Sequence, residues 1–172
     1  RLVCESASVK KKRLDTFLKS AYNTLSKTEI QMIVYSVQGK YPNCYNKFIE
    51  ACLNHLIPTA PERDVNVLIN IKKRLKSGNV GQCIGDCSEI TIELARFYED
   101  GTALTKDELA ANLAHELVHA KQYIFDEINA VDYTWKSNDY SECDYWDQPW
   151  EVEAYHREKV LTKKYWSNQC TK

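Results

Sequence analysis

Residues 114–122 read AHELVHAKQ and hold two of the four histidines of this 172-residue chain. Just upstream, Thr105 and Glu108 fit a capping box, in which the two side chains cover free backbone N–H groups at a helix start. Apolar residues then recur at helical spacing, at Leu113, Leu117, Ala120 and Ile124. The sequence therefore predicts a helix over about 105–124.

The histidines are spaced four residues apart, which places His115 and His119 on one face of that helix, about 6 Å apart at Cβ. Two imidazoles at this separation can bind one metal ion at about 2.0–2.1 Å each. Glu116 lies about 100° around the helix from His115 and can reach a water on the ion. This HExxH arrangement is typical of zinc hydrolases, in which the glutamate is the general base. The alternative is a buried helix with two hydrogen-bonded histidines.

The charge balance gives no sign of a strongly charged partner. The 23 Lys and Arg against 24 Asp and Glu give a formal net charge of −1, which indicates neither nucleic-acid nor membrane binding. No apolar run approaches the length that spans a bilayer. We expect a monomer that acts on a protein or peptide.

Seven cysteines are many for a reduced cytosolic enzyme of this size. Only Cys83 and Cys87 lie close together, and a single CxxxC pair is a poor zinc-knuckle candidate. Disulfides are favoured, since six cysteines could form three bridges and leave one thiol. Because no signal-like segment follows Arg1, we expect either a fragment or a chain whose leader has been removed. The expected location is secreted, extracellular or periplasmic.

Residues 1–80 read as helical. Apolar spacing predicts helices over 8–25, from a capping box at 26–29 to Gly39, from Pro42 to Pro58, and over 64–76. The basic cluster at 10–13 is interpreted as a solvated helix face. The glycine-containing segment 77–87 lacks the order of a phosphate-binding loop, and we interpret it as a turn-rich connection.

Beyond residue 87 the pattern changes. Ile90, Ile92 and Leu94 alternate with polar residues and predict a strand over about 88–98. Such a strand beside the motif helix could be an open edge that pairs with a peptide, or an ordinary core strand. Residues 126–148 are aromatic and acidic, which favours a structured loop. Pro149 fits the first turn of a final helix over about 149–166.

A catalytic zinc ion takes three protein ligands and leaves one position open. The remaining candidates are His156 and the carboxylates of the aromatic loop and the last helix. HELVHAKQ followed by PWEVEAY resembles the small zinc peptidases of the gluzincin type, and its glutamine resembles bacterial and phage HELxHxxQ proteins. This resemblance covers about residues 88–166. It implies Glu151 as the third ligand, from an E-x-x-A pattern, with Glu153 as the alternative if the register slips by two.

The resemblance is incomplete around the histidines. Many such families place an acidic residue after the alanine to orient one imidazole, but Tyr155 stands there, which leaves Asp126 or Asp144 for that role. A donor must also stabilise the oxyanion formed during hydrolysis. The candidates are His156, Tyr155, Tyr145 and Tyr140.

These observations predict an α+β, predominantly helical single domain over 1–172, with a helical part at 1–80 and a zincin-like catalytic core at 88–166. The resemblance implies a zinc-dependent metalloendopeptidase in which His115, His119 and Glu151 bind Zn²⁺ and Glu116 is the general base. One alternative is a secreted toxin- or effector-type zinc amide hydrolase that acts on cell-wall peptides or on one host protein. Another is a non-enzymatic, disulfide-bonded helical interaction domain.

Overall fold

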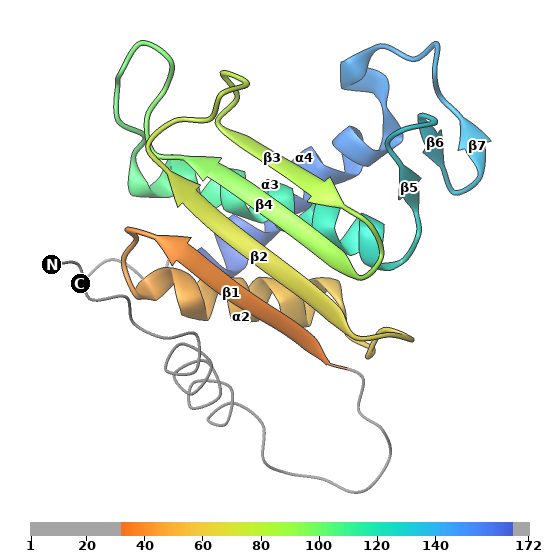
Figure 1. Ribbon diagram of the computed structural model, residues 1–172, viewed down its shortest axis with the longest axis horizontal. Coiled ribbons are helices and arrows are strands. Elements are labelled where there is room, and N and C mark those ends of the chain that lie inside the picture. Colours follow the sequence, from red (N-terminus) through yellow and green to blue (C-terminus); the bar gives the residue numbers. More distant parts are fainter. Residues whose placement is uncertain (1–31, 167–172) are drawn as a thin grey trace, which may run out of the picture. The chain divides into compact units, whose positions relative to one another are not determined.

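The computed structural model describes residues 32–166, which all fall within one compact unit of the chain. Within this unit the fold is α+β: a four-stranded sheet is backed on one face by helices, and a small three-stranded sheet lies apart from it (Figure 1). The helix expected over 8–25 lies outside the described residues, as does the capping box expected at 26–29.

The main sheet has the order β1-β2-β4-β3. Its strands are β1 (Ile33–Gly39), β2 (Val65–Lys72), β4 (Glu89–Ala95) and β3 (Gly81–Gly85). The first three are parallel, whereas β3 runs antiparallel to β4 at the edge. Helix α2 (Cys44–Leu56) connects β1 to β2, because two parallel strands need a long crossover.

The core lies between this sheet and the helices. Strand β2 shows the pattern clearly, since every second residue is buried, namely Val65, Val67, Ile69 and Ile71. These residues share one apolar cluster with side chains of α2 and of α3 (Lys106–Ile124), among them Phe48, Ile49, Leu113 and Leu117. Burial of this face fixes α3 against the sheet and so positions the HExxH turn.

Two segments that were expected to be helices are strands. Residues 33–39 form β1 and residues 65–72 form β2, so the helices predicted there within the helical part at 1–80 are wrong. Each segment is rich in valine and isoleucine, whose branched side chains suit a pleated surface. The two strands pair in register from Ile33 and Val65 onward. The helix expected between Pro42 and Pro58 is confirmed as α2.

The edge of the sheet is also different from the prediction. The strand expected over 88–98 is present as β4, but it lies between β2 and β3 and is not the edge strand. The edge on this side of the sheet is β3, within the segment 77–87, for which the sequence predicts a turn-rich connection. Gly81 and Gly85 weaken the strand pattern of these five residues, because glycine is depleted in strands.

The motif helix and the final helix begin where the sequence predicts. At the start of α3, the Thr105 hydroxyl accepts a hydrogen bond from the Glu108 backbone N–H at 3.2 Å, and the Glu108 carboxylate accepts one from the Thr105 backbone N–H at 2.8 Å. Helix α4 (Pro149–Leu161) has Pro149 in its first turn and continues as a π-helix, η2 (Thr162–Trp166).

The segment between α3 and α4 is structured, as expected. It contains the three short antiparallel strands of the second sheet, β5 (Ile128–Asn129), β6 (Thr134–Trp135) and β7 (Asn138–Asp139). A 3-10 helix, η1 (Tyr145–Asp147), follows directly before α4. This segment therefore connects α3 to α4, and the aromatic residues of η1 lie directly before the start of α4.

The cysteines do not form the expected network of three disulfide bridges. Cys52, Cys83, Cys87 and Cys143 are free thiols, while Cys44 is disulfide-bonded. Four free thiols among seven cysteines leave too few for three bridges. Cys52 is fully buried in the core, where a thiol packs as a small apolar side chain.

None of the helices over residues 32–166 has an apolar stretch of the length that a bilayer requires.

The capping box yields a stability prediction. Thr105→Ala removes the side-chain acceptor at the start of α3, and we expect it to lower the free energy of unfolding by about 1 kcal/mol. Urea denaturation measures this change. Thr59→Ala is the matched control, because Thr59 is exposed in the loop after α2 and its loss should change stability by less than about 0.5 kcal/mol. Equal stability of both variants would show that the box does not stabilise α3.

Candidate metal centre

Helices α3 and α4 bring three donor groups together. The Nε2 atoms of His115 and His119 lie 3.1 Å apart. Glu151 places Oε2 at 3.3 Å from the first Nε2 and Oε1 at 3.5 Å from the second. All three side chains are buried, and one ligand atom from each lies within 4.8 Å of the others. This group could hold a metal ion.

The outer nitrogens of both imidazoles are already engaged. His115 Nδ1 lies 3.0 Å from Glu158 Oε2, and His119 Nδ1 lies 2.8 Å from Gln122 Oε1. Carboxylate and amide oxygens accept hydrogen bonds, so each Nδ1 carries the hydrogen that it donates. When neither Nε2 carries a hydrogen, this arrangement directs the Nε2 lone pair of each ring at the other donors, as in metal-binding histidines.

The charges of the group also fit a cation. Burial alone would lower the pKa of His115, but the carboxylates of Glu151, Glu158 and Glu116 outweigh it and raise this pKa to about 9. Burial would likewise raise the pKa of Glu151, yet the two imidazoles hold it at about 2. Glu151 Oε2 is a buried oxygen without a hydrogen-bond partner in the described structure. A positive ion among the three donors would satisfy it.

Glu116 is buried beside this group but is not one of its three donors. Its carboxylate packs against Gly81 of the edge strand β3, so closely that a Cβ at that position would lie 2.5 Å from Glu116 Oε1. Burial raises the pKa of Glu116 to about 7, although the neighbouring imidazoles lower it in part. A carboxylate with this pKa can both take and release a proton near neutral pH.

Aromatic rings of the η1–α4 segment border the group. The ring of Tyr155 lies 4.7 Å from that of His115, and the ring of Trp146 lies 5.5 Å from that of Tyr155. The pKa of Tyr145 is raised by burial and by the neighbouring Glu151 carboxylate, so this hydroxyl is protonated beside the donors. Two of the predicted oxyanion donors, Tyr145 and Tyr155, therefore lie next to the site.

Other residues named from the sequence lie elsewhere. His156 is exposed on α4, and no described contact joins it to the three donors. Tyr140 packs against Trp150 at 6.2 Å between ring centroids. Glu153 contacts Lys121, Gln122 and Arg157, so Glu151 and not Glu153 completes the donor group.

The residues that orient the imidazoles are not the predicted ones. Asp126 pairs with Arg63 at 3.2 Å, and no described contact brings it or Asp144 to a histidine. Glu158 and Gln122 hold the two rings instead. Both had a signal in the sequence, because Glu158 lies two turns beyond Glu151 on one helix face and Gln122 follows His119 by three residues. Gly81 had no such signal, since its closeness to Glu116 depends on how β3 pairs.

Comparisons with known proteins do not assign this chain to a family. No protein-family model matches it, and no curated protein shows significant similarity to it. The likeness of HELVHAKQ and PWEVEAY to gluzincin peptidases thus stays an expectation from the motif. The case for a functional site stands on the geometry of the residues themselves.

The contact between Gly81 and Glu116 yields a second prediction. A methyl group in Gly81→Ala would press on Cδ and Cγ of Glu116, each 3.2 Å away, as well as on Oε1. We expect a loss of about 1 kcal/mol in the free energy of unfolding, the lower end for an overpacked site. Urea denaturation of the metal-free protein measures it.

The matched background for this test is Glu116→Ala, which removes the crowded atoms. Gly81→Ala should cost almost nothing in that background, because the backbone of Gly81 does not have a positive φ. The same cost in both backgrounds would mean that the methyl group strains something other than Glu116.

Proposed function

We propose that this chain is a zinc-dependent metallopeptidase with His115, His119 and Glu151 as ligands and Glu116 as general base. The observation that carries the proposal is the placement of Glu116. A carboxylate with a pKa of about 7 lies buried beside three converging donors and is not one of them. Hydrolysis at a metal needs such a group to take up the proton of the attacking water.

The donor types support zinc. Two imidazole nitrogens and one carboxylate oxygen are the protein ligands of several catalytic zinc sites, which keep a fourth position open. The same three donors also suit non-haem Fe(II) enzymes that activate oxygen. Glu116 favours hydrolysis, because a general base beside the ion serves water attack.

In the proposed hydrolysis, different residues of the chain would have different roles. A bound Zn²⁺ would supply a water with a pKa lowered toward about 7 and would polarise the carbonyl under attack. Glu116 would accept the proton of that water and later donate it to the leaving amine. Tyr145 or Tyr155 would donate a hydrogen bond to the oxyanion, since both hydroxyls lie beside Glu151.

The edge strand supports a peptide as substrate. Strand β3 is one of the two edge strands of the main sheet, the one whose Gly81 packs against Glu116. An extended peptide can add to such an edge through main-chain hydrogen bonds. A peptide paired with β3 would pass the general base, so we propose an endopeptidase that binds its substrate as an additional strand.

Metal analysis tests the ligand set. We expect the purified protein, reconstituted near pH 7, to hold one Zn²⁺ and His119→Ala to lose it during dialysis. The control is His156→Ala, because His156 is exposed and lies on the same helix as Glu151. Wild-type protein that stays free of zinc would contradict the proposal and would favour a non-enzymatic interaction domain.

Glu116→Gln tests the general base. The amide keeps the size of the side chain but cannot accept the proton, so we expect zinc and fold to be retained and peptide hydrolysis to fall by about 10²–10⁴-fold. Cleavage of labelled casein, with purified peptidoglycan as the second substrate, gives the rate and separates a general peptidase from a cell-wall hydrolase. Glu62→Gln changes an exposed carboxylate and serves as control. Undiminished cleavage by Glu116→Gln would remove Glu116 from the mechanism.

A further inference from the structure

The amide of Gln122 decides which nitrogen of His119 carries the hydrogen. With its oxygen toward the ring, as observed at 2.8 Å, it accepts from Nδ1–H and leaves Nε2 bare. With its NH₂ group toward the ring, Nδ1 would have to accept, and the hydrogen would sit on Nε2. That hydrogen would face the His115 Nε2 only 3.1 Å away, and His119 would no longer be a ligand. A half-turn rotation of the Gln122 amide would thus put the hydrogen of His119 on Nε2, where the ring could not bind a metal ion.

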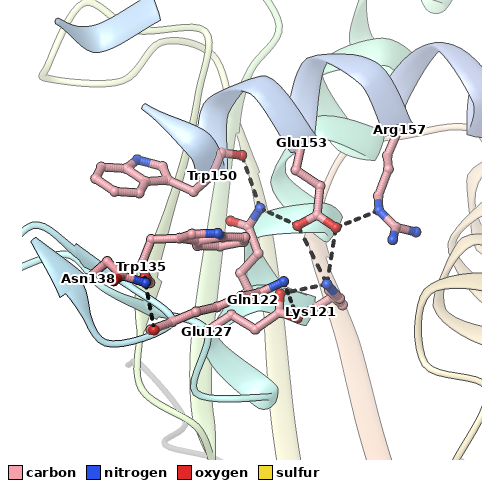
Figure 2. Close-up of polar contacts among 9 residues, drawn as sticks. Lys121, Gln122, Glu127, Trp135, Asn138, Trp150, Glu153 and Arg157 are labelled. Atoms are coloured by element: carbon pink, nitrogen blue, oxygen red, sulfur yellow. Dashed lines mark hydrogen bonds and ion pairs between the residues drawn. The ribbon is translucent and has the colours of Figure 1, made fainter. Parts of the chain in front are cut away.

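Two acceptors hold the amide in the ligand-forming orientation. Gln122 Nε2 donates to the Trp150 backbone carbonyl at 3.0 Å and to Glu153 Oε2 at 3.0 Å (Figure 2). Both hydrogens of the NH₂ group are therefore used by groups that can only accept. A rotated amide would place its oxygen against these two oxygens. Gln122 is fully buried, so water could not relieve that repulsion.

Glu153 is itself held from the other side. Its Oε1 accepts from Lys121 Nζ at 3.2 Å and from Arg157 Nε at 2.8 Å, while its Oε2 accepts from Gln122 at 3.0 Å and more weakly from Lys121 Nζ at 3.5 Å. Lys121 is buried and bridges to Glu127 Oε2 at 2.6 Å, so the ammonium has two carboxylate partners. Figure 2 shows this network running from α3 and the residues after it to α4.

We infer that Glu153 is a positioning residue: through Gln122, it holds His119 in the tautomer whose Nε2 can bind the metal ion. The inference rests on the proposed metal site, because a metal ion can bind Nε2 of His119 only when that atom carries no hydrogen. His115 has no such relay, since Glu158 accepts from its Nδ1 directly. The two ligand histidines are thus oriented by different means, one by a carboxylate and one by an amide that a more distant carboxylate fixes.

Two variants with the same chemical change test the inference. Glu153→Met removes the acceptor of Gln122, whereas Glu127→Met removes the other partner of Lys121 and leaves Gln122 untouched. Each leaves Lys121 with one carboxylate. Affinity for Zn²⁺ alone, measured against a chromophoric chelator, should fall 10–100-fold in Glu153→Met, as for other outer partners of metal ligands. It should change less than threefold in Glu127→Met. Equal losses in the two variants would overturn the inference.

The coupling through Gln122 has its own test. In a Gln122→Met background the relay is already gone, so adding Glu153→Met should lower zinc affinity no further. Glu153→Gln keeps an oxygen that can accept from Gln122 and should stay nearer to the wild type than Glu153→Met. A second full loss in the double variant would mean that Glu153 acts by another route.

A measurement on the metal-free wild type keeps the test independent of folding defects and of catalysis. At a pH above the raised pKa of His115, where both rings are neutral, nitrogen-15 NMR of the imidazoles should find the His119 hydrogen on Nδ1 and both Gln122 amide hydrogens protected from exchange. A hydrogen on Nε2 of His119 would overturn the inference even if the protein binds zinc. Conversely, a wild type that binds no zinc but shows the Nδ1–H tautomer would contradict the proposed function and leave the orienting role of Glu153 intact.

Discussion

Three buried side chains, His115, His119 and Glu151, direct lone pairs at one another, and the rest of the site depends on this convergence. Two imidazole nitrogens 3.1 Å apart, with a carboxylate beside them, repel unless a positive charge lies among them. In the metal-free protein a proton supplies that charge, which is why the pKa of His115 is raised to about 9 in spite of burial. A site with this preference for positive charge could hold a metal cation.

The convergence is possible because three elements approach closely at positions with small side chains. Ala154 is fully buried on α4, one turn beyond Glu151, and gives α3 room to pack. On the other side, Gly81 lets β3 come into contact with Glu116. Glu116 is therefore confined between the edge strand and the three donors, where burial raises its pKa to about 7. The small residues at positions 81 and 154 thus account both for the close packing of these elements and for the burial that raises the pKa of Glu116.

The features that could be predicted from the sequence are those encoded by residues close together in the chain. The capping box at Thr105 marks the start of α3 and the i, i+4 spacing of the histidines places both rings on one face, as the structure has them. The sequence predicts helices where β1 and β2 lie, because the apolar residues of both strands also match helical spacing over a few positions. In β2 the alternation from Val65 to Ile71 was the better signal. Strand β3 had no pattern, since its partner lies in β4 and glycine interrupts it.

The orienting residues show why the second layer of the site was harder to predict than the first. Ligands must be imidazole, carboxylate or thiolate, whereas many side chains can accept a hydrogen from a ring nitrogen. The use of an amide, Gln122, to accept from His119 has an electrostatic consequence. With a dication bound, the charges of Glu151 and Glu158 balance it, and the neutral amide of Gln122 adds none. A carboxylate at position 122 would place another negative charge near Glu116, whose pKa is already raised by Glu151 and Glu158. An amide orients His119 without that cost, provided that something else fixes which way it faces.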